Sequence, residues 1–182
     1  MSREQSQRFA IACLAAGVVV LVDQATKAAA LGGMSQTERI PLLGDLLGLQ
    51  LAFNPGAILS LGADFTGLLT LLGVGAVVVL VVAAARARTE TWAVGIGLIL
   101  GGAIGNVIDR LFSPPGFGVG HVTDFLAYGN LFIGNLADVA LGAGALVLGL
   151  NMWIRHRRAR AKAAEQVTAH LGSAAGAAVT GP

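Results

Sequence analysis

Four long apolar runs alternate with polar stretches along the chain. They extend over residues 9–31, 67–85, 92–112 and 131–154. A helix of about 20 residues crosses a hydrocarbon core of roughly 30 Å, so each run is long enough to span a membrane. Trp92 and Trp153 stand at ends of two runs, where aromatic rings favour the headgroup layer. The pattern predicts an all-α membrane protein with four transmembrane helices.

The connection between the first two runs has a different pattern. In residues 49–53 the larger apolar residues alternate, which is typical of a short strand, and Asn54, Pro55 and Gly56 follow as a turn. We therefore expect a small extracytoplasmic β sheet or flap over residues 36–66, between helices 1 and 2 and lying on the membrane surface.

The basic residues predict an orientation. If the four helices alternate in direction, nine of the twelve Lys and Arg residues share one side: Arg3, Arg8, Arg86, Arg88, Arg155, Arg157, Arg158, Arg160 and Lys162. The positive-inside tendency places that side, with both termini, in the cytoplasm.

We expect residues 1–154 to form a single integral membrane domain. A tail over residues 155–182 would be basic at first, then disordered from Ala163, because it is rich in Ala, Gly, Ser and Thr.

Composition narrows the class of protein. Hydrophobic residues make up 55% of the chain and charged residues 12%, against about 25% charged residues in soluble domains. A net charge of +2 lacks the strong basic field of a nucleic-acid binder. The single cysteine, Cys13, excludes an internal disulfide and a cysteine zinc cluster. Cys13 also faintly resembles a lipid-attachment site, but the apolar run continues past it, so we expect an uncleaved first helix.

Polar residues inside the apolar runs gather at one depth. At about 1.5 Å per residue, Asp23 and Asn106 lie roughly 21 Å from the inner ends of helices 1 and 3, and Asp138 lies at about 20 Å. A charged group costs on the order of 2 to 3 kcal/mol in a spanning helix, so such residues tend to face the protein interior and to serve a function. The alternative is that they only hold the helices together by hydrogen bonds.

Of the four acidic residues that reach this layer, two lack a cationic neighbour in the sequence. Asp23 has Lys27 one turn away and Asp109 is followed by Arg110, whereas Asp124 and Asp138 have no such partner. We expect the loop before helix 4 to bring Asp124 toward Asp138, two turns inside that helix. Two close carboxylates share a proton and can act as acid and base on a water molecule. The alternative for Asp124 is a helix N-cap or a turn residue.

Five short blocks carry a resemblance to a known family. They are Val22-Asp23-Gln24 with Lys27, residues 53–57, residues 101–110, Val122-Thr123-Asp124-Phe125, and Asn135-Leu136-Ala137-Asp138. In this order they resemble the motif blocks of the bacterial lipoprotein signal peptidases, also called signal peptidase II. The resemblance covers residues 9 to about 154.

This resemblance implies an intramembrane aspartyl endopeptidase of the bacterial cytoplasmic membrane. It would remove the signal peptide from diacylglyceryl-modified prolipoproteins by cleaving before the lipobox cysteine. Its catalytic residues would be Asp124 and Asp138, and Asp23 and Lys27 would be a structural polar pair. The residues that bind substrate or support the dyad would be Asn54, Gly56, Asn106, Asp109, Arg110 and Asn135. The resemblance also implies sensitivity to globomycin.

As partners we expect lipid-modified prolipoproteins and membrane lipids, and no nucleic acid. We expect no metal and no cofactor. The enzyme would be a monomer with its site near the outer face of the membrane. The sequence departs from the family pattern at Ile58, Leu59 and Gly134, where the substrate groove and the flap would be affected more than catalysis. Two other classes remain as alternatives: a small ion- or proton-coupled carrier, for which no paired repeat is seen, and a purely structural membrane subunit.

Overall fold

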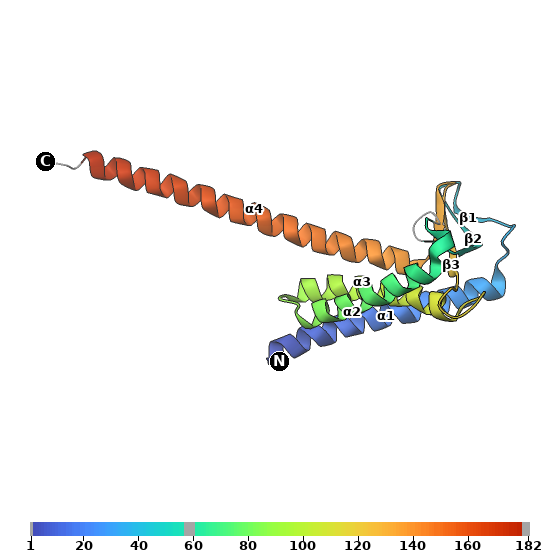
Figure 1. Ribbon diagram of the computed structural model, residues 1–182. Coiled ribbons are helices and arrows are strands. Elements are labelled where there is room, and N and C mark those ends of the chain that lie inside the picture. Colours follow the sequence, from blue (N-terminus) through green and yellow to red (C-terminus); the bar gives the residue numbers. More distant parts are fainter. Residues whose placement is uncertain (1, 57–60, 180–182) are drawn as a thin grey trace.

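Four long helices and one small sheet make up the protein. The computed structural model describes residues 2–56 and 61–179, with side chains as far as residue 162. The helices are α1 (Arg3–Gly33), α2 (Thr66–Ala85), α3 (Glu90–Phe112) and α4 (Leu136–Val179). Each contains a segment that is long and apolar enough to cross a membrane. The sheet lies across one end of these helices, and the N-terminus lies at the other end (Figure 1).

The first three helices extend slightly beyond the predicted runs. α1 begins at Arg3, where Ser2 caps it by accepting a hydrogen bond from the backbone N–H of Gln5 (3.2 Å). α3 begins at Glu90 for the same reason, because Thr89 accepts from the N–H of Trp92 (3.3 Å). Hydropathy marks the apolar part of a helix, whereas capping side chains determine where its hydrogen bonding starts.

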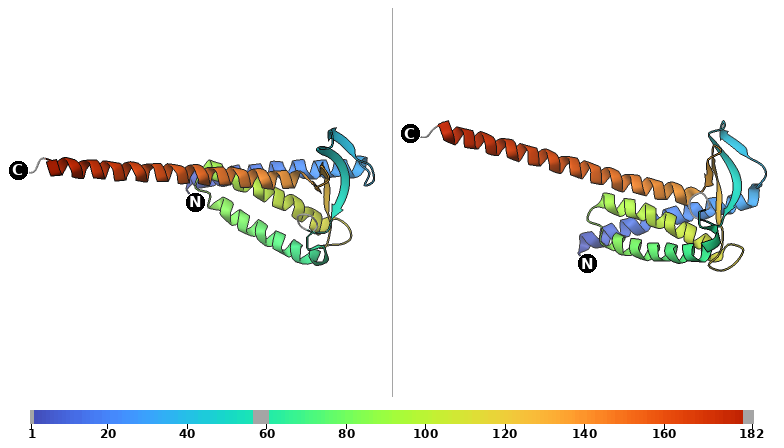
Figure 2. Two further views of the ribbon diagram at one scale, coloured as in Figure 1. Left: turned by 90° about the horizontal axis from the view of Figure 1, so that it is seen from above. Right: turned by 45° about the horizontal axis from the view of Figure 1, so that its top comes forward.

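The fourth helix differs from the prediction at both ends. It begins at Leu136 and not at Leu131, because Phe132–Gly134 form a strand. It then continues to Val179, through the segment for which composition predicts disorder from Ala163. Alanine has the highest helix propensity and no proline interrupts this stretch before Pro182, so the helix started in the membrane segment is able to propagate. Figure 2 shows α4 running well past the other three helices.

The sheet draws its strands from two separate connections. β1 (Ile40–Leu43) and β2 (Leu47–Asn54) lie between α1 and α2, as predicted, whereas β3 (Val122–Tyr128) and β4 (Phe132–Gly134) lie between α3 and α4 and were not predicted. The strand order is β1-β2-β3-β4, with all neighbours antiparallel. The short 3₁₀ turn η2 (Ala63–Phe65) leads into α2. The central pair, β2 and β3, therefore joins the two halves of the chain.

α3 is the central helix, and its glycines permit close packing on both sides. A Cβ on Gly101 would lie 2.8 Å from the backbone oxygen of Ala16 in α1, and a Cβ on Gly102 would lie 2.5 Å from that of Ala137 in α4. Such distances exclude any side chain, as expected for small-residue packing between membrane helices. This close approach brings the polar residues of α1, α3 and α4 within hydrogen-bonding distance.

Candidate active site

The two candidate catalytic aspartates come from different elements. Asp124 lies in the middle of β3, opposite Ala52 of β2, and only 2% of its surface is exposed. Asp138 lies in the first turn of α4 and is exposed to a cavity of about 540 Å³ that both carboxylates line. The predicted positions, a loop for Asp124 and a place two turns inside the helix for Asp138, were therefore wrong. Both errors arise from the unpredicted strands β3 and β4.

Asn135 links the two aspartates and is itself fully buried. Its backbone N–H donates to Asp138 Oδ2 (3.2 Å), and its Oδ1 accepts from the Asp138 N–H (3.0 Å), so the two residues form a reciprocal cap at the start of α4. With Oδ1 used in the cap, the amide nitrogen Nδ2 faces Asp124 and donates to its Oδ1 (2.6 Å). One residue, through its side chain and its backbone N–H, thus fixes the relative position of the two carboxylates.

Asn106 of α3 orients Oδ1 of Asp138. Its Oδ1 accepts from Lys27 Nζ and from Asn135 Nδ2, both at 3.1 Å. Since these two donors occupy the oxygen side of the amide, the Nδ2 group faces Asp138 and donates to its Oδ1 (3.0 Å). A chain of hydrogen bonds therefore runs from Lys27 through Asn106 to Asp138.

A buried cluster of charges lies behind the aspartates. Lys27 Nζ lies 2.8 Å from Asp23 and 2.9 Å from Asp109, and all three side chains are almost completely buried. Gln24, which sequence reasoning did not assign to the site, donates from Nε2 to both carboxylates (3.1 Å each). The prediction that Asp109 is neutralised by its neighbour Arg110 was wrong, because the cation that contacts Asp109 is the ammonium group of Lys27.

Each carboxylate of this cluster holds the backbone next to one candidate catalytic residue. Asp23 Oδ1 accepts from the N–H of Ala137, the residue before Asp138 (2.9 Å). Asp109 Oδ2 accepts from the N–H of Thr123, the residue before Asp124 (3.0 Å). Since Lys27 binds both carboxylates, it ties the start of α4 to the middle of β3. The cluster sets the separation of the two aspartates, although none of its members lines the cavity.

Arg110 holds the turn at the end of β2. Its guanidinium donates to the carbonyl oxygens of Pro55 (3.3 Å) and Gly56. Within this turn, Asn54 donates from Nδ2 to Asp124 Oδ2 (3.2 Å) and accepts from the N–H of Gly56 (3.0 Å). Asn54, Gly56 and Arg110 all line the cavity. Of the three departures from the family pattern, Ile58 and Leu59 lie outside the described residues.

The third departure, Gly134, lies directly beside Asp138. A Cβ at this position would be 2.9 Å from Asp138 Oδ2, so a side chain could be accommodated only if the carboxylate moved. Glycine here leaves Asp138 free to complete the reciprocal cap with Asn135. The cavity wall next to it is formed by Phe132 and Ile133 of β4.

The rest of the cavity is apolar and lies between the helices. Its lining there consists of Gly73 from α2, Ala103 and Val107 from α3, and Leu141 and Gly142 from α4. None of these residues carries a polar signal in the sequence, so only the helix arrangement reveals them. Within residues 2–56 and 61–162, no three His, Cys, Asp or Glu side chains are placed to hold a metal ion.

Asp124 is buried whereas Asp138 is exposed, and burial disfavours the charged form of a carboxyl group. It raises the pKa of Asp124 to about 7, and the nearby negative charge of Asp138 adds to this effect. Hydrogen bonds from Asn135 and Asn54 and the charge of Lys27 act in the opposite direction. Near neutral pH a large fraction of the Asp124 side chains is therefore protonated, and this group is able to donate a hydrogen bond to a bound carbonyl.

Comparison with known proteins adds an independent finding. A family model described as signal peptidase (SPase) II matches residues 15–154. A lipoprotein signal peptidase of Rhodococcus jostii is 41% identical over 142 residues, which cover 78% of this chain and 72% of that protein. One from Leifsonia xyli is 46% identical over 124 residues, covering 68% and 57%, and one from Mycobacterium avium is 37% identical over 142 residues, covering 78% of each.

A solved structure shares the fold. The chain superimposes on a bacterial membrane enzyme, determined by the in meso method, with a TM-score of 0.69 and 24% sequence identity. The match covers 78% of this chain and 87% of that one. Over most of its length the chain therefore shares the fold of a bacterial membrane enzyme.

Proposed function

The chain belongs to the signal peptidase II family, and from this premise we propose that it is an aspartyl endopeptidase that removes the signal peptide from prolipoproteins. Its substrate is a prolipoprotein with a diacylglyceryl group on the lipobox cysteine, and the bond cleaved lies on the N-terminal side of that cysteine. The observation that carries the proposal is the pair Asp124 and Asp138, bridged by the single residue Asn135 and facing a cavity between apolar helices.

The proposed mechanism assigns different roles to the two carboxyl groups. Asp138 is exposed to the cavity and takes a proton from the attacking water, whose oxygen bonds to the scissile carbonyl carbon. Asp124 is buried, holds its proton near neutral pH and donates it to the carbonyl oxygen. Proton transfer from Asp138 to the leaving nitrogen and return of a proton to Asp124 then break the C–N bond. Water is the only co-reactant.

The residues that we propose to bind substrate or to support the two aspartates are those expected from the sequence, except that Asp109 changes its group. Asn106 and Asn135 orient the carboxyl groups, while Asn54, Gly56 and Arg110 present the turn that faces the substrate. Asp109 joins Asp23 and Lys27 as part of the buried cluster that positions the dyad. We propose that residues 1–154 constitute the peptidase domain, in a cytoplasmic membrane with both termini on the cytoplasmic side and the sheet on the outer side.

The direct test is cleavage of a diacylglyceryl-modified prolipoprotein by the purified protein in detergent or proteoliposomes. We expect one cut before the modified cysteine, inhibition by globomycin, and little cleavage of the same prolipoprotein without the lipid. Mass spectrometry of the two products locates the bond. Equal cleavage of both forms would contradict the proposed substrate, and no cleavage of the modified form would contradict the function.

The raised pKa of Asp124 predicts the pH dependence of this reaction. Because the proposed mechanism requires Asp124 to be protonated, kcat/KM should fall as pH rises through about 7. Removing the hydrogen bond from Asn54 with Asn54→Ala raises the pKa of Asp124 further, so the falling limb should move to higher pH while the maximal rate decreases. A pH profile of kcat/KM for both proteins measures this. A limb that stays in place, or moves to lower pH, would refute the proton assignment.

The apolar part of the cavity predicts a steric block. A Cβ on Gly142 meets no atom within 4 Å, so Gly142→Leu should project into the cavity without a clash and reduce kcat/KM by about tenfold or more, chiefly through KM. Gly149 is the matched control. It lies seven residues further along α4, on nearly the same helix face, is equally open and does not line the cavity. Gly149→Leu should cleave at the wild-type rate; equal rates for the two variants would argue against substrate binding here.

A further inference from the structure

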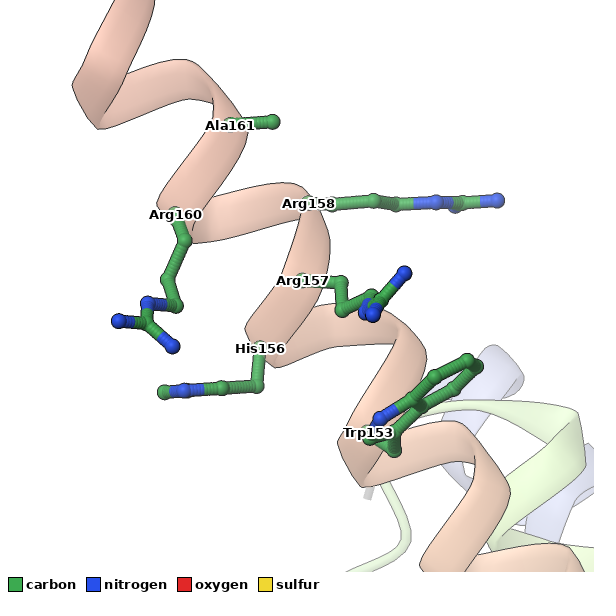
Figure 3. A pocket seen from close by; sticks show the side chains of 6 residues that line it. All are labelled: Trp153, His156, Arg157, Arg158, Arg160 and Ala161. Carbon is green, nitrogen blue, oxygen red and sulfur yellow. The ribbon is translucent and has the colours of Figure 1, made fainter.

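A cluster of cations surrounds the middle of α4, where the helix leaves its apolar segment on the side away from the sheet. We call Arg155, Arg157, Arg158, Arg160 and Lys162 the basic collar; all five are exposed. No acidic residue occurs in α4 between Asp138 and Lys162. The arginine side chains leave the helix in different directions, with Arg158 and Arg160 on opposite sides (Figure 3). Positive charge is thus presented around the helix and not along one face.

The collar follows directly on the membrane-spanning part of α4. From Leu136, the first residue of the helix, to Trp153 is about 26 Å at the usual helical rise, which is close to the thickness of a hydrocarbon core. Trp153 is 55% exposed, and Arg157 stacks over its ring at 4.8 Å from the centroid. A tryptophan at this depth is typical of the headgroup layer, so the collar lies at the level of the lipid phosphates.

The charges around the collar do not neutralise it. On this side the other helices and their connection carry Arg3, Arg8, Arg86 and Arg88, against Glu4 and Glu90 as acids, and α4 adds one acid after the collar, Glu165. Glu4 is already paired with Arg8 at 2.9 Å. α3 meets α4 here through a neutral contact, in which Trp92 Nε1 donates to Asn151 Oδ1 (3.2 Å). The surface therefore has several unneutralised cations among the described residues, and its complement is an anion.

We propose that the basic collar binds the headgroups of anionic phospholipids, such as phosphatidylglycerol, in the leaflet at this end of the helices. Guanidinium groups bind phosphate through two parallel hydrogen bonds, and several cations at one level attract anionic lipids in preference to zwitterionic ones. In a membrane, lipid headgroups can approach α4 from several sides. This fits the arginines, which leave the helix in different directions. The proposal is independent of the peptidase activity.

The test uses Trp153 as a local probe in the full-length protein. With Trp92 replaced by Phe, the remaining tryptophan reports which lipids lie next to the collar. The protein is reconstituted in phosphatidylcholine vesicles containing a small fraction of brominated phosphatidylglycerol or of brominated phosphatidylcholine, and quenching is compared. We expect roughly threefold or stronger preference for phosphatidylglycerol, weakening at 1 M salt because the Debye length falls to about 3 Å.

A triple variant assigns the preference to the collar. Arg155→Gln/Arg158→Gln/Arg160→Gln removes three charges but keeps Arg157 over Trp153, so the probe's surroundings are retained. The preference should fall to near one, whereas Arg39→Gln, a charge change at the other end of the molecule, should leave it intact. Thermal unfolding in detergent checks that all proteins are folded. Equal quenching by both lipids in the starting protein, or a preference that survives the triple variant or high salt, would overturn the proposal.

Discussion

Replacing Asp124 or Asp138 with Asn is expected to reduce the rate of prolipoprotein cleavage by about 10²- to 10⁴-fold, the usual contribution of a positioned acid or base. In both variants an amide replaces a carboxyl group of almost the same size. The Asn oxygen at position 138 can still accept the Asn135 N–H that caps α4, so the helix start should persist. The loss would then be one of proton transfer and not of fold.

The measurement is single-turnover cleavage of the diacylglyceryl-modified substrate, with thermal unfolding in detergent as the folding check. Asp45→Asn is the matched control, since Asp45 is an exposed carboxylate at the β1–β2 turn of the same sheet. It should retain the wild-type rate. If either dyad variant cleaves within a few-fold of wild type, that residue does not transfer a proton in the rate-determining step.

The second large effect is expected from Lys27→Met, which is predicted to lower the free energy of unfolding by about 3 to 5 kcal/mol. It removes the only cation that contacts Asp23 and Asp109 among the described residues and leaves two buried carboxylates facing each other. The midpoint of denaturant or thermal unfolding in detergent measures this. The pair Glu4 and Arg8 at the surface, in which Glu4 is exposed and Arg8 half-buried, is the control: Arg8→Met should change stability by less than about 0.5 kcal/mol.

A triple variant separates the stabilising role of Lys27 from its role in positioning. Lys27→Met/Asp23→Asn/Asp109→Asn removes the uncompensated charges and should recover most of the lost stability. Its activity should remain low, because Asn106 has lost the donor that fixes its amide toward Asp138. Loss of the Lys27 charge also raises the pKa of Asp124, so the falling limb of the pH profile should move to higher pH. Full recovery of activity together with stability would show that Lys27 only stabilises the fold.

The membrane helices could be predicted from the sequence because a single physical property, apolar length, determines them. The polar residues within them could be predicted to meet for a similar reason. A charged group in a spanning helix needs a partner, and Asp23, Asn106 and Asp138 are indeed brought into one hydrogen-bonded network. The family followed from the motif blocks and is shown by the comparisons.

The strand that carries Asp124 could not be predicted in the same way. Val122–Tyr128 is almost continuously buried and lacks the alternation of polar and apolar residues that identifies a half-exposed strand. Its pairing with β2 depends on residues about 70 positions away, which no local pattern records. The same is true of Gly142 and of the other apolar residues that line the cavity, since their role arises only from the packing of α2, α3 and α4.

The pairing of β2 with β3 joins two halves of the chain that contribute different residues to the candidate site. Both proposed catalytic residues, Asp124 and Asp138, follow residue 90, as do Asn106 and Asn135, which bind them. The first half supplies Lys27, which neutralises Asp109; Asp23, which anchors the start of α4; and the turn at Asn54, which contacts Asp124. A second half made alone would contain both proposed catalytic carboxyl groups and still lack Lys27, the cation that contacts its buried Asp109. On the proposed mechanism, the site is therefore complete only when both halves are present and joined through the pairing of β2 with β3.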